Sequence, residues 1–319
     1  MIPASRWFSL VLYFGFLILT GCMDKPQETL RIGAVLWPGY EPLYLAKKLG
    51  HFEKQPIKLI DYLSNTDAML AFKNRNLEAG AFTLDETLQI ISDGIDVDII
   101  LIMDVSNGGD VILANEDIKD VKALKGKAVA VESTAVGAFV LKRALELNGM
   151  ELNDIKIVST NAMEQSSSFA KGEIVAAVSF DPYRTQLLRL GKKEIFNSTL
   201  IPNEVFDVLV IRKDYSKKNR VVVQHLINSW FDALKYQQEH PVESAKYSLK
   251  RFDTTSEDYI NGLKLIKFAT KDENSYLLDA EKSPLLSQQN KVVEILKSLR
   301  LISRTPSLEG HLDKSYIPK

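Results

Sequence analysis

Acidic side chains at the ends of predicted strands are the groups in this sequence that could do chemistry. Asp104, Glu132 and Asp181 each follow a predicted strand, where a carboxylate needs a partner or water. The histidines lack the i, i+4 spacing of a metal site and are scattered through the chain, at His51, His225, His240 and His311. The sequence also lacks the nucleotide-binding and nucleophile motifs of common enzymes. These observations predict a binding site without catalytic residues, metal ions or cofactors.

Cys22, the single cysteine of the chain, follows an apolar run at residues 7–20. The run is too short to span a bilayer comfortably. The sequence LTGC at residues 19–22, followed by polar residues, resembles a bacterial lipobox. This resemblance implies that a signal peptide, residues 1–21, is removed and that the Cys22 thiol is lipidated. Residues 22–29 would then link a membrane anchor to a folded chain that faces the periplasm or the cell exterior. An uncleaved anchor helix with an incidental cysteine is the alternative.

Composition excludes several classes of protein. The chain has 319 residues, 45% of them apolar, with 40 Lys and Arg against 41 Asp and Glu. Because there is no basic excess to neutralise phosphates, we expect no nucleic-acid partner. A single cysteine excludes disulfide frameworks and cysteine-rich zinc sites. The length suits two lobes of roughly 150 residues each, and we expect a monomer.

Strand and helix patterns alternate after the linker, which indicates βαβ units and parallel sheets. The predicted strands are residues 30–36, 57–62, 79–83, 97–103, 128–131, 155–158 and 174–180. The predicted helices between them are residues 41–49, 64–72, 84–92, 136–147 and 165–171. From residue 221 the chain reads as mostly helical, with helices at 221–238, 241–250, 256–268 and 284–299.

Two similar stretches predict that the lobes share one plan. Residues 70–82 and 169–180 both run from a helix through a polar turn into a strand of small residues. Extended segments at residues 110–114 and 206–212 are interpreted as two strands that cross between the lobes. The predicted lobe 1 therefore contains residues 30–111 and 207–319, and lobe 2 contains residues 112–206. Two lobes joined by such a hinge enclose a cleft that can close.

Four motifs resemble those of periplasmic solute-binding proteins of the nitrate, sulfonate and taurine type and the thiamine-pyrimidine-precursor type. They are WPGYEP at residues 37–42, DVSNGGD at 104–110, DVKALKGK at 120–127 and FDPY at 180–183. The resemblance spans most of residues 30–250. It implies a two-lobed type II fold that captures a small molecule and delivers it to the permease and ATPase of an ABC importer. A binding protein that presents its ligand to a membrane sensor is the alternative.

The predicted ligand contacts all follow strands, so they are expected to converge on one cleft. They are Trp37, Tyr40, Asn65, Asp85, Asp104, Asn107, Glu132, Ser133, Thr134 and Asp181. Several have a purely structural interpretation. Ser64, Asn65, Ser133 and Thr134 also suit helix capping, and Trp37 also suits a packed core. Thr83 and Glu86 have the spacing of a capping box, which favours a structural role for Glu86.

The charges of the predicted cleft favour a cationic or nitrogen-containing ligand. Asp85, Asp104, Asp110, Glu132 and Asp181 stand in the predicted cleft loops, with Arg184 as the only nearby base. Carboxylates beside aromatic rings suit an amine or a polar nitrogen heterocycle through charge pairing and cation–π contact. An anion of the sulfonate or nitrate type is the alternative, because helix N-termini can bind anions without basic side chains.

Overall fold

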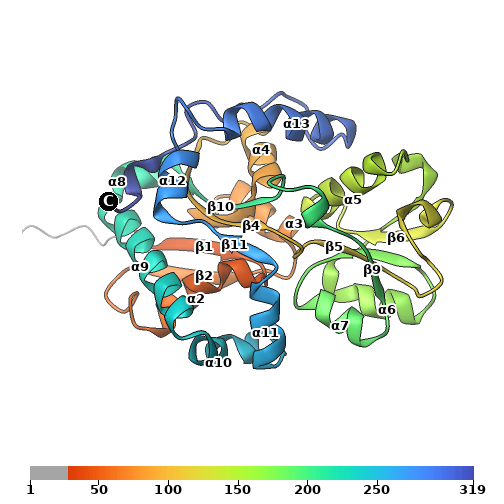
Figure 1. The fold of residues 1–319 in the computed structure, drawn as a ribbon. Coiled ribbons are helices and arrows are strands. Elements are labelled where there is room, and N and C mark those ends of the chain that lie inside the picture. Colours follow the sequence, from red (N-terminus) through yellow and green to blue (C-terminus); the bar gives the residue numbers. More distant parts are fainter. Residues whose placement is uncertain (1–27) are drawn as a thin grey trace, which may run out of the picture.

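A computed structural model of the protein describes residues 28–319. The predicted signal peptide and the predicted lipidation site at Cys22 lie outside these residues. Among the described helices, none has the length and apolar character needed to cross a bilayer. The chain forms two α/β lobes, each built on its own sheet (Figure 1). The predicted two-lobed fold is therefore confirmed.

Lobe 1 is organised around a six-stranded sheet with the order β11-β4-β10-β3-β1-β2. Its strands are β1 (Leu30–Ala34), β2 (Ile57–Asp61), β3 (Ala79–Thr83), β4 (Val97–Ser106), β10 (Phe206–Arg212) and β11 (Ile266–Phe268). Strands β2, β1 and β3 are parallel, whereas β10 runs antiparallel to both β3 and β4. The intervening helices are α2 (Glu41–Lys48), α3 (Asn65–Lys73) and α4 (Leu84–Ser92). Ser64 caps α3, as its alternative interpretation predicted, by accepting from the amide of Asp67 at 3.1 Å.

Lobe 2 is organised around a five-stranded sheet with the order β7-β6-β8-β5-β9. Its strands are β5 (Val111–Ala114), β6 (Ala128–Val131), β7 (Lys156–Ser159), β8 (Ala176–Ser179) and β9 (Lys193–Asn197). Its helices are α5 (Val136–Leu147), α6 (Gln165–Ala170) and α7 (Tyr183–Arg189). The central strands β5, β6 and β8 are nearly all buried, which explains their continuous runs of apolar residues, whereas the edge strands β7 and β9 are largely exposed.

The two sheets follow the same plan. Each has three parallel strands in the order second, first, third, namely β2-β1-β3 and β7-β6-β8, with an antiparallel strand beside the third. The two similar sequence stretches occupy matching positions, because one forms α3 and β3 and the other forms α6 and β8. The carboxyl ends of both sets of parallel strands therefore carry the loops in which the binding residues were predicted.

The segments that cross between the lobes differ from the prediction. Residues 110–114 and 206–212 were expected to cross as strands, but β5 pairs within lobe 2 and β10 pairs within lobe 1. The crossing is made by residues 107–110 and 198–205. Ser106 and Ser198 hold these segments together, with 2.8 Å between their hydroxyl oxygens. The two crossings were expected, but they lie next to the predicted residues rather than on them, because a buried apolar run looks the same whether it pairs in one sheet or connects two.

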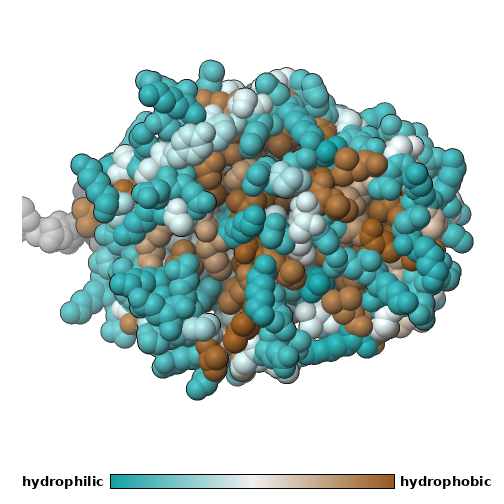
Figure 2. All heavy atoms as spheres, viewed as in Figure 1, coloured by the Kyte–Doolittle hydropathy of each residue, from teal (hydrophilic) through white to brown (hydrophobic). Residues whose placement is uncertain are grey.

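The C-terminal part of the chain packs around lobe 1 (Figure 1). Its helices are α8 (Lys213–Lys218), α9 (Arg220–Glu239), α10 (Pro241–Phe252), α11 (Ser256–Leu263), α12 (Lys271–Leu277) and α13 (Leu285–Ser298). The helix predicted over residues 256–268 instead ends at Leu263, and β11 then adds an edge strand to β4. Residues 266–268 are extended because they pair with the edge of β4, and the helical periodicity of the sequence does not indicate this pairing. Polar side chains cover most of the surface seen in Figure 2, and hydrophobic ones show toward its middle and over lobe 2.

Candidate ligand-binding site

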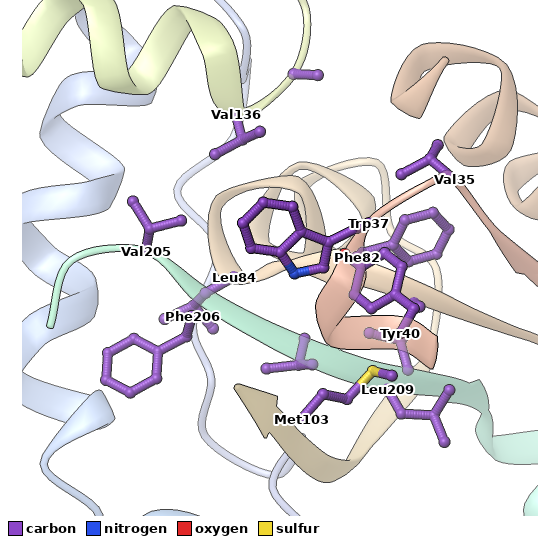
Figure 3. Packing of buried hydrophobic residues seen from close by; sticks show 14 of the residues in the cluster. Val35, Trp37, Tyr40, Phe82, Leu84, Met103, Val136, Val205, Phe206 and Leu209 are labelled. Atoms are coloured by element: carbon purple, nitrogen blue, oxygen red, sulfur yellow. The ribbon is translucent and has the colours of Figure 1, made fainter. Parts of the chain in front are cut away.

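A narrow cavity of about 20 Å³ lies between the two lobes. Lobe 1 contributes most of its wall, lobe 2 contributes two apolar residues, and the crossing segment contributes an acid. The lining residues are Val35, Trp37, Tyr40, Asn65, Thr83, Asp110, Val136, Phe180 and Asp207. Figure 3 shows Val136, at the start of α5, above the ring of Trp37. A compound held here would contact both lobes at once.

Aromatic rings from both lobes meet at the cavity. Trp37 lies edge-on to Phe180 of lobe 2, with 6.0 Å between ring centroids, and Phe180 lies edge-on to Tyr183 at 5.8 Å. Trp37 is only 5% exposed and belongs to the core as well as to the cavity. Both interpretations of this tryptophan, packing and cavity wall, therefore hold. Such rings offer flat apolar faces and attract cations.

Two buried aspartates face each other below the rings. Asp104 in β4 and Asp207 in β10 are direct neighbours across the two strands, and they are 0% and 3% exposed. The indole Nε1 of Trp37 donates to Asp104 Oδ1 at 3.3 Å. The hydroxyl of Tyr40 donates to Asp207 Oδ1 at 2.5 Å. Each acid thus has one neutral donor, and no Lys or Arg is among the residues that line the cavity.

Burial changes the protonation of this pair. Burial raises the pKa of Asp104 to about 8. Burial, together with the charge of Asp104, raises the pKa of Asp207 well above its usual value. Two carboxyl groups this close cannot both ionise easily, so the pair retains a proton at neutral pH. Burial also raises the pKa of Asp110 to about 6. The site can therefore change its charge when a ligand enters.

A second group of acids lies next to the pair, on α4. Burial raises the pKa of Asp85 to about 6, and burial with the charge of Asp85 raises that of Glu86 to about 8. Asp85 Oδ2 is buried without a hydrogen-bond partner in the described part of the chain. Glu86 Oε2 accepts from the amide of Thr83 at 3.0 Å, and the two residues form the predicted capping box. The structural role expected for Glu86 is confirmed.

The rim of the cavity joins lobe 1 to lobe 2. Glu132 of lobe 2 accepts from the amide of Thr66 at 2.8 Å and from its hydroxyl at 2.5 Å. The hydroxyl oxygens of Thr134 and Thr66 are 2.6 Å apart. Farther out, Arg189 of α7 pairs with Asp258 of α11. The two lobes are therefore in contact around the cavity.

The structure separates the predicted ligand contacts into three groups. Trp37, Tyr40 and Asn65 line the cavity, and Asp104 lies directly behind Trp37. Asp85 is buried on α4, and Glu132 and Thr134 bind Thr66 at the rim. The remaining residues lie away from the cavity wall: Ser133, Asn107 and Asp181.

Local hydrogen bonds explain why those three residues lie elsewhere. Ser133 is 2.7 Å from the hydroxyl of Ser159, and the amide of Asn107 donates to Leu265 in the crossing region. Asp181 accepts from the amide and the hydroxyl of Thr185, at 3.0 and 2.6 Å, and so satisfies the start of α7. A position after a strand puts a residue at the right edge of the sheet, but it does not fix where the side chain points.

Several lining residues were absent from the predicted set. Asp110 had been placed in a predicted cleft loop, Phe180 belonged to the motif at residues 180–183, and Asp207 lay in the crossing segment predicted at residues 206–212. Val35, Thr83 and Val136 carried no signal, because small apolar or capping residues at strand ends are common. Asp207 could have been found from its position opposite Asp104, had the pairing of β10 with β4 been known.

Among residues 28–319, no cluster of three or more His, Cys, Asp or Glu side chains is arranged to hold a metal ion. The described acids are hydrogen-bonded to tyrosine, tryptophan, threonine or backbone donors instead. The arrangement can accept hydrogen bonds from a ligand, stack against it and exchange protons with it.

Gly39→Ala is expected to disturb the site by steric overlap. A Cβ at this position would overlap both Asp104 Oδ2 and Trp37 Nε1, so one of the two side chains must move. We expect a loss of about 1 to 3 kcal/mol in the free energy of unfolding, measured by urea denaturation. Gly262→Ala is the milder comparison, because its Cβ would approach Asp181 Oδ2 only to 3.1 Å. Equal stability of the Gly39 variant and the parent chain would contradict this view of the packing.

Known proteins resemble this chain in sequence and in fold. A protein from Bacillus subtilis (strain 168) described as a putative aliphatic sulfonates-binding protein is 26% identical over 252 residues, which are 74% of this chain and 75% of that protein. The chain spans only 38% to 46% of the length of five other curated relatives that it matches.

Solved structures share the fold at low sequence identity. The alkanesulfonate-binding protein SsuA from Xanthomonas axonopodis pv. citri, bound to MOPS, matches 90% of this chain and 98% of its own with a TM-score of 0.76 and 18% identity. The desulfurization enzyme DSZB matches 90% of this chain and 97% of its own with a TM-score of 0.64 and 13% identity. The fold therefore occurs in binding proteins and in an enzyme.

The family model described as the NMT1-like family matches residues 23–250, which is well over half of the chain. The match covers the first strand, all of lobe 2 and the return into lobe 1 as far as α10. The resemblance inferred from the four sequence motifs is confirmed. The protein belongs to the NMT1-like family.

Proposed function

We propose that this protein is a solute-binding protein that captures a small molecule between its lobes and delivers it to the permease and ATPase of an ABC importer. The observation that carries the proposal is the cavity, because residues of both lobes line it and a ligand would hold the lobes together. The description of the Bacillus subtilis relative as a binding protein supports the same class of function. Presentation of the ligand to a membrane sensor is the alternative, and neighbouring genes for a permease and an ATPase would decide against it.

For the ligand we favour an amine or a nitrogen heterocycle. Asp110 and Asp207 offer hydrogen-bond acceptors, and the rings of Trp37, Tyr40 and Phe180 offer flat or cation-attracting faces. The cavity, of about 20 Å³, has room for little more than a water molecule while the lobes are in contact, so the lobes must separate to admit a ligand. Because no basic side chain lines the cavity, the negative charge of a bound anion would be unpaired.

A sulfonate is the second candidate ligand. It is favoured by the description of the Bacillus subtilis relative and by the MOPS-bound alkanesulfonate-binding protein of similar fold. Neutral donors such as the side-chain amide of Asn65 would then have to supply the hydrogen bonds to the anion. The names of relatives give no support to the amine, which rests on the cavity lining alone.

The first experiment is a ligand screen. Native mass spectrometry of the purified protein would detect a retained compound, and thermal-shift assays would compare a panel of amines and heterocycles with a panel of sulfonates. We expect stabilisation by members of the amine panel. Stabilisation only by sulfonates would move the second candidate to first place. Chemical conversion of the bound compound, followed by mass, would overturn the assignment as a binding protein in favour of an enzyme.

We also propose that the protein is a monomer attached to the membrane by lipid at Cys22. Cys22→Ala is expected to abolish acylation, because no other thiol exists in the chain to receive it. Intact-mass analysis and detergent partitioning of both forms measure this. An acylated product from the variant, or an unmodified parent chain that retains residues 1–21, would contradict the proposed anchor.

A further inference from the structure

Each lobe extends one glutamate to the start of a helix in the other lobe. Glu132, which follows β6 in lobe 2, accepts from the amide and hydroxyl of Thr66 in the first turn of α3 in lobe 1. Glu86, on α4 of lobe 1, accepts with Oε1 from the amide of Val136 at 3.3 Å. Val136 is the first residue of α5 in lobe 2. The two contacts are reciprocal.

Helix starts favour these contacts for two reasons. The first amides of a helix have no partner within it, and the aligned peptide dipoles make this end positive. Helices α3 and α5, of 9 and 12 residues, are long enough for both effects. Ala135 gives α5 no side-chain cap, and Ser64 caps α3 only at the amide of Asp67, which leaves the amide of Thr66 to another group. A carboxylate from the opposite lobe therefore completes each helix start.

The two glutamates are held so that they reach across the cleft. Glu86 is 0% exposed, and the Thr83 amide fixes its Oε2, which leaves Oε1 directed at lobe 2. Glu132 is reinforced by Thr134, whose hydroxyl meets that of Thr66. When the lobes separate, the Thr66 and Val136 amides lose these carboxylates. The closed arrangement therefore gains contacts that the open one lacks, which is the requirement for favouring closure.

We propose that Glu86 and Glu132 latch the lobes together and, by occupying the first amides of the two helices that flank the cleft, exclude anionic solutes from these helix starts. The inference rests on the proposed solute-binding function and deepens it by naming a class of ligand that the closed site rejects. Helix starts are the places where a protein without basic side chains binds sulfonates, phosphates or carboxylates. Here both places are filled by the protein's own carboxyl groups, next to Asp85 and the Asp104–Asp207 pair.

The latch can be tested without any ligand. The mature chain with Cys22→Ser carries no thiol, so spin labels can be placed at Lys48→Cys in lobe 1 and Lys156→Cys in lobe 2, both exposed. Distance distributions then report the ratio of closed to open molecules. Each charge-assisted hydrogen bond contributes on the order of tenfold to this ratio. We expect Glu132→Ala to lower the closed-to-open ratio about tenfold, and Glu132→Gln, which keeps an acceptor, to lower it less.

Glu116→Gln is the matched control, because it removes the same charge from an exposed position in lobe 2 that pairs with Lys193. It should leave the distance distribution unchanged. Glu132 lies at the rim and its substitution spares the core, so a folded variant is expected, and its thermal unfolding verifies this. The same distances in the parent chain and in Glu132→Ala would overturn the latch. Because no solute is added, this result does not depend on finding the true ligand.

The exclusion of anions has its own measurement. Titration calorimetry with ethanesulfonate compares the parent chain with the double variant Glu86→Ala, Glu132→Ala. We expect no measurable binding to the parent chain and measurable binding to the double variant, whose helix starts no longer hold a carboxyl group. Binding of ethanesulfonate to the parent chain, or its failure to bind the double variant, would overturn the exclusion.

Discussion

The free energy of unfolding of the ligand-free protein is expected to fall by at least about 2 kcal/mol as the pH rises from 5 to 8. Asp104 has a folded-state pKa of about 8 against an ordinary value of 3.8. Between these two values the folded protein holds a proton that the unfolded chain has released. The contribution of Asp104 to stability is therefore complete below the pKa that it has in the unfolded chain. It is lost as the pH rises through the pKa that it has in the folded protein. Each such group contributes a slope of up to about 1.4 kcal/mol per pH unit.

Other buried acids act in the same direction. The pKa of Asp207 is raised well above its usual value, that of Glu86 is raised to about 8, and those of Asp85 and Asp110 are raised to about 6. Groups whose pKa is lowered act outside this range, as Asp279 does with a value of about 2, because their contribution is lost only at acid pH. The maximum of stability is therefore expected at mildly acidic pH.

Urea denaturation at several pH values measures this effect. Asp104→Asn should flatten the dependence between pH 5 and 8, since an amide cannot release the proton. Asp279→Asn is the comparison variant, because it removes a half-buried carboxylate that is paired with Lys314 and should not change the slope in this range. A stability that is constant or rises toward pH 8 in the parent chain would contradict the protonated pair.

Affinity for an amine ligand is expected to fall at least tenfold in Asp207→Asn and in Asp104→Asn. Asp207 lines the cavity and Asp104 is its neighbour across the strands. A cation bound here draws the proton from the pair, so the resulting carboxylate and the ligand attract each other in a dry site. Removing one member of a buried charge pair typically costs about 2 to 5 kcal/mol. The parent chain should also bind the amine more tightly at pH 8 than at pH 6.

Titration calorimetry in buffers of different ionisation enthalpy measures both the affinity and the protons released. Asp181→Asn serves as the control, since Asp181 satisfies the start of α7 and does not line the cavity. Asp104, Glu132 and Asp181 were all predicted as ligand contacts, but they lie in three different environments, behind Trp37, at the rim and at the start of α7. Unchanged affinity in both cavity variants would remove the amine and favour the sulfonate.

Sequence patterns predicted the elements around the cleft because the determinants are local. Strand β1 was expected from its β-rich run, and α2 from Pro42 in its first turn and the glycine after its end. The Thr83–Glu86 capping box likewise depends on residues three apart. The number of lobes followed from the alternation of strands and helices, which parallel sheets require.

Features that depend on distant pairing were not predictable in this way. The Asp104–Asp207 pair forms only because β10 inserts beside β4, and nothing in either segment of the sequence indicates that the other is its neighbour. Thr66 was overlooked as the partner of Glu132 because a threonine in the first turn of a helix has an ordinary local role. The second contact of Glu86, to Val136, was missed for the same reason, since its capping role already accounted for the residue.

The position of β10 also determines the order in which the lobes can be completed. During synthesis and export the N-terminal end emerges first. Strands β3 and β4 do not pair with each other, because β10 lies between them, and β10 follows all of lobe 2 in the chain. Lobe 2, by contrast, is built from consecutive strands whose first and last members pair, Val111 with Asn197. A chain halted before residue 206 therefore carries every strand of the second lobe attached to a first lobe that still lacks its central strand.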